Sequence, residues 1–209
     1  MRIIVTRPRD QASALVERLR ELGHEVEVCP LIEVEPIGPE TLDVSGYDWV
    51  IVTSANGARE LAKRMRGRPA RVAAIGTATA EAWPGDVDLV PPVSTQEGLL
   101  AALPRPAGHV LFAGAEGARR LLVDELGADF VPLYRTNELR PGDFPDGDLV
   151  LLASPSAARA FSELARTIPV VSIGPETTAA AERGRLDVVA EARDHDLEGL
   201  IEAVREATR

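Results

Sequence analysis

The sequence repeats itself at an interval of about one hundred residues, and this repeat constrains the fold more than any other feature. Residues 48–55, DWVIVTSA, resemble residues 148–155, DLVLLASP. Two further pairs keep nearly the same spacing, 74–80 with 172–178 and 97–99 with 198–200. Chance similarity rarely holds its spacing along a whole chain, so we interpret the sequence as two related halves.

Short apolar runs alternate with amphipathic patterns in both halves. Residues 49–53 are typical of a buried strand, whereas residues 11–22 carry leucines at helical spacing and precede Gly23, a residue suited to end a helix. We expect strands at 3–6, 25–30, 49–53, 71–75, 89–90, 109–112, 129–133, 148–153, 169–173 and 188–189, and helices at 11–22, 55–65, 77–82, 95–102, 117–126, 156–165, 175–182 and 196–206. This alternation predicts an α/β fold whose parallel sheets are covered by helices on both faces.

Two corresponding segments connect the halves. Residues 30–36 alternate apolar and acidic side chains, as an exposed strand does, and residues 133–139 are their counterpart in the repeat. The sequence therefore predicts two flavodoxin-like parallel-sheet domains that arose by internal duplication and are joined by a two-stranded linker.

Composition excludes several classes of function. Acidic residues outnumber basic ones 33 to 23 in a chain of 209, whereas binding to nucleic acid or to an anionic membrane needs clustered basic residues. Cys29 is the single cysteine, which excludes an intrachain disulfide and a thiolate metal site. No apolar stretch reaches the length of a signal core or a membrane span. We expect a cytoplasmic monomer that acts on a small molecule.

Polar residues follow most of the predicted strands. Ligands of open parallel sheets bind outside the carboxyl ends of the strands, beside helix N-termini. The residues expected there are Thr6, Arg7, Ser54, Asn56, Gly76, Ser94, Thr95, Ser154, Ser156, Gly174 and Thr177. Any one of the hydroxyls can simply cap a helix, which is worth roughly 1 kcal/mol. Together they can also line a cleft for anions, and a half-exposed cap can serve both purposes.

Several well-known motifs are missing from the sequence. No phosphate loop, dinucleotide-binding glycine pattern or Gly-x-Ser-x-Gly elbow occurs. Residues 194–196, Asp-His-Asp, resemble a metal or catalytic motif, but their place before a helix favours Asp196 as a cap. Tyr134 can donate a proton or merely pack against Leu133, and Arg7 and Arg119 can hold carboxylates, although Arg119 can equally be a solvated helix residue.

These pieces, in order along nearly the entire chain, resemble the uroporphyrinogen-III synthase family. The matching segments are 5–8 (VTRP), 52–57 (VTSANG), 74–80 (AIGTATA), 132–136 (PLYRT), 153–157 (ASPSA), 172–177 (SIGPET) and 196–200 (DLEGL). The resemblance implies two α/β domains, a discontinuous one of residues 1–36 plus 136–209 and a second of residues 37–135.

The resemblance also implies a reaction. The family is a lyase family that closes the linear tetrapyrrole hydroxymethylbilane into uroporphyrinogen III, inverting ring D through a spiro-pyrrolenine, in haem biosynthesis. It needs no metal, nucleotide or organic cofactor. By this resemblance Tyr134 assists the departure of hydroxide, while Thr79, Thr177, Ser54 and Ser154 are candidate substrate ligands.

Two alternatives stay open at this stage. A non-catalytic protein with two lobes could close on a small anion, as solute-binding proteins do, although the lobes are small and a signal peptide is not evident. An acidic adaptor that works through protein contacts has only the net charge of −10 in its favour.

Overall fold

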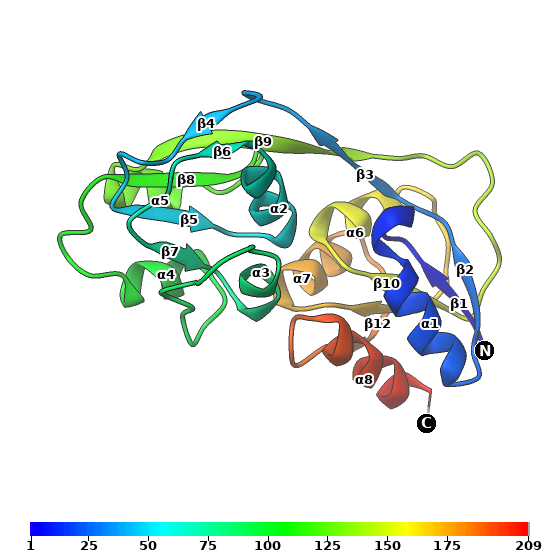
Figure 1. Ribbon diagram of the computed structural model, residues 1–209. Helices are drawn as coiled ribbons and strands as arrows, with labels where there is room; N and C mark the ends of the chain where they lie inside the picture. Colours follow the sequence, from blue (N-terminus) through cyan, green and yellow to red (C-terminus); the bar gives the residue numbers. More distant parts are fainter. Residues whose placement is uncertain (209) are drawn as a thin grey trace. The chain divides into compact units, whose positions relative to one another are not determined.

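Two five-stranded sheets, each with its own helices, organise residues 1–208, which are the residues that this computed structural model describes (Figure 1). The chain divides into two compact units, residues 1–34 with 137–209 and residues 35–136. The predicted α/β class with parallel sheets is confirmed. Among the described residues, no helix has the length and apolar character that crossing a membrane requires.

The first unit holds a sheet in which all neighbouring strands are parallel. Its strands lie in the order β12-β11-β10-β1-β2. They are β1 (Arg2–Val5), β2 (Glu25–Val28), β10 (Leu149–Leu152), β11 (Val170–Ser172) and β12 (Val188–Glu191). The helices are η1 (Arg9–Gln11), α1 (Ser13–Glu21), α6 (Pro155–Ser162), α7 (Pro175–Arg183) and α8 (Leu197–Ala207).

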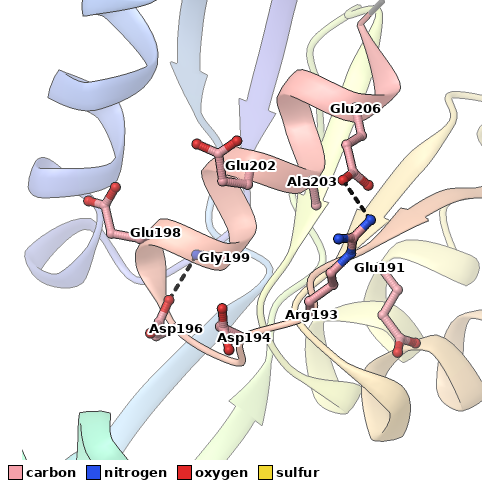
Figure 2. Close-up of a pocket in the computed structure, with 9 residues that line it drawn as sticks. All are labelled: Glu191, Arg193, Asp194, Asp196, Glu198, Gly199, Glu202, Ala203 and Glu206. Atoms are coloured by element: carbon pink, nitrogen blue, oxygen red, sulfur yellow. Dashed lines mark hydrogen bonds and ion pairs between the residues drawn. The ribbon is translucent and has the colours of Figure 1, made fainter.

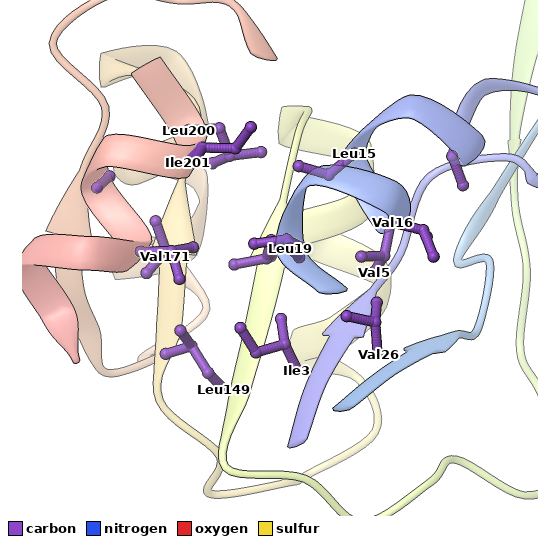
Figure 3. Close-up of a cluster of buried hydrophobic side chains, with 14 of the residues drawn as sticks. Ile3, Val5, Leu15, Val16, Leu19, Val26, Leu149, Val171, Leu200 and Ile201 are labelled. Atoms are coloured by element: carbon purple, nitrogen blue, oxygen red, sulfur yellow. The ribbon is translucent and has the colours of Figure 1, made fainter. Parts of the chain in front are cut away.

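Both faces of this sheet carry apolar side chains, because its strands are apolar at successive positions and successive residues of a strand point to opposite sides. Ile3 packs with Leu19 of α1 and Leu200 of α8, as Figure 3 shows. Ile4 points the other way and packs with Phe161 of α6. All five side chains are fully buried, and each contributes about 1.5–3 kcal/mol by leaving water. The continuous apolar run of β1 is therefore explained by burial on both faces.

The second unit repeats this layering around the order β3-β9-β8-β5-β7. Its strands are β3 (Ile32–Pro36), β5 (Trp49–Val52), β7 (Val72–Ala74), β8 (Val110–Ala115) and β9 (Asp129–Glu138), with a small pair β4 (Leu42–Asp43) and β6 (Met65–Arg66). Its helices are α2 (Ala55–Arg64), α3 (Thr77–Glu81), α4 (Gln96–Ala102) and α5 (Leu121–Leu126). Trp49, Ile51 and Phe112 pack with Leu99 of α4 and Leu122 of α5.

The chain passes from one unit to the other within β3 and within β9. These two strands are neighbours in the second sheet. The Ile37 N–H donates to the Leu133 carbonyl, and the Leu139 N–H donates to the Leu31 carbonyl. Because residue numbers rise along one strand as they fall along the other, the two strands run antiparallel.

Two elements are shorter than the sequence patterns predict. The helix expected at 117–126 begins only at Leu121, where the N-cap position holds Arg120 and no capping hydroxyl. The strand expected at 89–90 is reduced to a single bridge between Leu89 and Ala73. Two prolines follow it and provide no N–H for a ladder.

Two other elements differ in extent. The first expected helix is divided into η1 and α1, and the strand expected at 129–133 and the extended segment expected at 133–139 form one continuous strand, β9. The extension of β9 follows from its neighbour β3, which supplies hydrogen-bond partners along the added length.

Candidate functional site

The candidate residues lie at the carboxyl ends of the parallel strands, along one edge of each sheet. In each unit the strand order reverses between two central strands, β1 and β10 in the first and β8 and β5 in the second. Such a reversal leaves a crevice outside the strand ends, and this is where doubly wound sheets bind ligands. Thr6 and Ser154 follow the strands of the first reversal, and Ser54 follows a strand of the second.

Four of the loops at these edges end in a helix cap. The cap side chains accept a hydrogen bond from the backbone N–H three residues later, which satisfies an otherwise unpaired donor. The bonds are Gly57 N–H to Ser54 Oγ at 3.0 Å, Gly98 N–H to Thr95 Oγ1 at 3.0 Å, Ala157 N–H to Ser154 Oγ at 3.1 Å and Gly199 N–H to Asp196 Oδ1 at 2.8 Å. The capping interpretation is thus confirmed for these residues, including Asp196.

Ser54 also contacts the phenol of Tyr134. The two oxygens lie 2.8 Å apart, although the residues are 80 positions apart in the chain. Tyr134 is only 6% exposed, and this burial raises the pKa of the phenol, while the hydrogen bond with Ser54 lowers it. Burial has the larger effect, so the pKa of the phenol lies above its ordinary value.

A β-bulge places Tyr134 in this position. Gly114 of β8 pairs with Pro132, and the next residue, Ala115, pairs with Tyr134, so that Leu133 is an extra residue on β9. The bulge shifts the register between β8 and β9 by one residue, and Leu133 and Tyr134 are both buried. Pro132 suits such a place because it has no N–H to give to a ladder. The packing of Leu133 and the hydrogen bond of Tyr134 therefore occur together.

Two arginines beside these strand ends bind carboxylates of the chain itself. Arg135 donates to Glu116 at 2.8 and 3.0 Å, which lowers the pKa of that carboxyl. Arg119 donates to Glu97 at 2.7 and 3.1 Å and lowers its pKa to about 2. Each positive charge is thus matched by a carboxylate next to it. Binding of an acidic ligand would rest on other groups.

Two glycines start helices at equivalent places in the two units. Gly76 precedes α3 and Gly174 precedes α7, and neither helix has a side-chain cap. A β-carbon at Gly76 would lie 2.7 Å from Ser94 Oγ, and one at Gly174 would lie 2.8 Å from Cδ2 of His195. Each glycine therefore leaves room for a side chain from the following loop.

The remaining candidates differ in how far they are buried. Thr6 is fully buried, and its hydroxyl donates to the Leu151 carbonyl at 2.7 Å within the sheet. Thr79 and Thr177, at the same position of α3 and α7, are 5% and 2% exposed. The partly exposed candidates are Arg7, Asn56, Thr95, Ser154 and Ser156, of which Ser156 accepts a bond from Arg159, and Ser94 is exposed.

Within the second unit, the structure brings together Ser54 with Tyr134 and Gly76 with Ser94. Within the first unit, it packs Gly174 against His195, a residue that was not among the ligands predicted from the sequence. The repeat offers a signal for His195, because it occupies the place before the α8 cap that Ser94 occupies before the α4 cap. The Tyr134–Ser54 bond has no such signal, since it joins residues that are 80 positions apart and lie on β9 and just after β5, two strands separated by β8.

A separate cavity of about 310 Å³ lies beside α8 (Figure 2). Its lining carries six carboxylates, on Glu191, Asp194, Asp196, Glu198, Glu202 and Glu206, and one arginine, Arg193, which is paired with Glu206 at 3.1 Å. The excess of carboxylates makes this cavity unfavourable for anions. None of the residues that we predict to bind the substrate lines it. Within residues 1–208, no three His, Cys, Asp or Glu side chains are grouped so as to hold a metal ion.

Known proteins share both the sequence and the fold. The sequence profile of a family described as "Uroporphyrinogen-III synthase HemD" matches residues 13–202. The uroporphyrinogen-III synthase of Synechococcus elongatus is 26% identical over 99% of this chain and 95% of its own. The porphyrin biosynthesis protein HemD of Ruminiclostridium josui is 30% identical over 90% of this chain and 45% of its own.

A solved structure shows the same fold at low sequence identity. It is a crystal structure of a mutant uroporphyrinogen III synthase from the extremely thermophilic bacterium Thermus thermophilus, which superimposes with a TM-score of 0.61. The two sequences are 16% identical, and the match covers 100% of this chain and 98% of the other.

Proposed function

The chain belongs to the uroporphyrinogen-III synthase family, enzymes of tetrapyrrole biosynthesis, and from this premise we propose how its own residues carry out the reaction. Hydroxymethylbilane first loses its hydroxyl group and becomes an electrophilic azafulvene. The substituted carbon of ring D attacks it and forms a spiro-pyrrolenine, which fragments and closes again with ring D inverted. Closure without inversion occurs spontaneously, so the enzyme must above all hold the flexible chain in the reacting geometry.

The buried phenol of Tyr134 is the observation that carries this proposal. A tyrosine phenol is protonated at neutral pH, as a group that gives a proton to a departing hydroxyl must be, and burial raises the pKa of Tyr134 further. Tyr134 lies beside Ser54, at the carboxyl end of strands in a parallel sheet, where such folds bind their ligands. We assign Tyr134 as the acid that converts the leaving hydroxyl into water.

The acetate and propionate groups of the substrate need hydrogen-bond donors on the protein. We propose that Thr6, Arg7, Ser54, Asn56, Gly76, Thr79, Ser94, Thr95, Ser154, Ser156, Gly174 and Thr177, or the backbone N–H groups beside them, supply these contacts. Support comes from helix N-termini, which attract anions within about one turn. This local attraction must outweigh the net charge of −10.

We also infer that the two units arose by duplication and are joined by β3 and β9. The second sheet, read as bridge residue Leu89, β7, β5, β8 and β9, has the same order as β12, β11, β10, β1 and β2. Counted along the chain, the first unit has the flavodoxin-like order 2-1-3-4-5, and the second unit begins at the strand equivalent to the third of these, so it has the same order as a circular permutation. The equivalent caps at Ser54 and Ser154, and at Thr95 and Asp196, agree with a common origin.

Incubation of the purified protein with freshly prepared hydroxymethylbilane, followed by separation of the uroporphyrinogen isomers, tests the activity. We expect isomer III to predominate. Isomer I as the main product, together with tight binding of a small anion, would instead indicate the non-catalytic alternative. That the enzyme works as a cytoplasmic monomer without nucleic acid stays a prediction, and light scattering tests the monomer.

A further inference from the structure

We infer that Ser54 is a positioning residue, which directs the proton of Tyr134 toward the substrate and then stabilises the phenolate that remains. This inference rests on the proposed acid role of Tyr134. It assigns the single hydroxyl proton of Ser54 to Tyr134, a role that capping does not explain, so that a contact of Ser54 with a substrate carboxylate is left to its backbone N–H. The argument depends on contacts within residues 35–136 alone.

The hydrogen bonds around Ser54 allow the serine to be the donor to the phenol, and this is the direction that we infer. Ser54 Oγ already accepts a bond from the Gly57 N–H at 3.0 Å, at the N-terminus of α2. Its own proton can therefore be given to the Tyr134 oxygen, 2.8 Å away. With the serine as donor, the phenol proton is released from this bond and points elsewhere. It is then available to a leaving group.

The bond between Ser54 and Tyr134 becomes more important once the phenol has given its proton to the leaving hydroxyl. A phenolate at a side chain that is only 6% exposed loses most of its hydration, which is costly without a compensating donor. Ser54 is the hydrogen-bond partner of the phenol in the described part of the chain. The positive end of the α2 dipole, reaching the serine through Gly57, strengthens this donation.

The proton and electron balance is simple. The carbon–oxygen bond of the hydroxymethyl group breaks, and the electron pair leaves with oxygen, which takes the Tyr134 proton and departs as water. The pyrrole becomes an azafulvenium cation, and Tyr134 becomes a phenolate held by the Ser54 hydroxyl. Loss of a proton from the substrate after ring closure restores the phenol, so no further reactant is needed.

The other unit provides a matched comparison. Ser154 caps α6 through the Ala157 N–H at 3.1 Å, just as Ser54 caps α2. The chain has only two tyrosines, Tyr47 and Tyr134, and both lie in the unit of residues 35–136. Ser154 therefore has the cap bond without a phenol of its own unit beside it. Replacing either serine removes a cap, but only replacement of Ser54 removes a bond to Tyr134.

The experiment compares Ser54→Ala, Ser54→Thr and Ser154→Ala, each in a Tyr47→Phe background, so that tyrosinate absorbance reports Tyr134 alone. In Ser54→Ala we expect the titration of Tyr134 to move to higher pH and kcat to fall about tenfold with little change in KM, the effect of one lost hydrogen bond to a developing charge. Ser54→Thr, which keeps the hydroxyl, should restore both. Ser154→Ala should leave the titration of Tyr134 unchanged, and it should lower the free energy of unfolding about as much as Ser54→Ala does.

Contrary outcomes separate this inference from the proposed function. An unchanged Tyr134 titration in Ser54→Ala, or a change in KM alone, would overturn the positioning role and leave Ser54 as a cap or a substrate ligand. If Tyr134→Phe retains full kcat, the acid role itself fails, whereas the titration still reports whether Ser54 controls the phenol. Production of isomer I by the unaltered protein would reject the enzyme assignment independently of both.

Discussion

Gly174 and His195 are packed so closely that a β-carbon on the glycine would lie 2.8 Å from Cδ2 of the imidazole. The backbone of Gly174 is extended, with φ 162°, a conformation open to any residue. Glycine is therefore required by space rather than by backbone freedom. Gly76 shows the same relationship to Ser94 in the other unit, at 2.7 Å.

Gly174→Ala should destabilise the protein by about 1 kcal/mol, because the added methyl group displaces the imidazole ring. His195→Ala removes the obstacle. Urea unfolding of both single variants and the double variant measures the coupling, which we expect to be favourable by about 1 kcal/mol. Strictly additive effects would show that the contact does not determine the cost.

Gly199 lies at a more crowded place, in the first turn of α8. A β-carbon there would lie 2.0 Å from the Asp194 carbonyl oxygen, and the Gly199 N–H serves the Asp196 cap. Since the obstacle is backbone, Gly199→Ala should lower the free energy of unfolding by about 2 kcal/mol. Glu202→Ala, on the same helix, should stay within about 0.5 kcal/mol. Similar values for both variants would contradict this explanation.

Tyr134→Phe should reduce kcat about tenfold or more with the fold intact, because the variant lacks the proton donor. Single-turnover kinetics, together with circular dichroism and thermal unfolding, separate the two effects. Tyr47→Phe is the matched control and should keep its kcat. Tyr47 precedes β5 and bonds to Asp129 at the opposite ends of the strands. Unchanged turnover in Tyr134→Phe would remove its acid role.

Stability should decline at alkaline pH. An unfolded tyrosine ionises near pH 10, whereas burial raises the pKa of Tyr134 in the folded protein. Above that pH the unfolded chain has lost a proton that the folded chain keeps, so stability falls until the pH passes the folded pKa. Tyr134→Phe should weaken this decline. Urea unfolding at a series of pH values tests it, and identical slopes would show that Tyr134 makes no contribution.

Substrate binding should weaken with salt. The substrate is a polycarboxylate, and its attraction to helix N-termini and Arg7 acts against a protein of net charge −10. Ions screen such attraction over roughly 10 Å at 0.1 M salt. We expect KM to rise several-fold between roughly 0.05 and 0.5 M salt while kcat changes little. A KM independent of salt would count against charge-assisted binding.

Local patterns predicted the helices and strands well. Apolar runs and helical spacing indicated the parallel α/β class, and hydroxyls before helices indicated caps at Ser54, Thr95 and Ser154, because these signals act over only a few residues. The strand expected at 89–90 and the helix expected at 117–126 were overestimated. There, prolines and the lack of a capping hydroxyl limit an element that apolar content alone suggests.

By itself, then, the sequence determined the alternation of strands and helices, the repeat that pairs Ser54 with Ser154, and the polar residues that follow the carboxyl ends of the strands. Only the tertiary structure decided that Tyr134 meets Ser54, that His195 fills the space above Gly174, and that Arg119 and Arg135 are matched by Glu97 and Glu116. The physical reason is distance along the chain. Caps and periodicity depend on neighbours within one turn, whereas these contacts depend on strand order and on a bulge at Leu133.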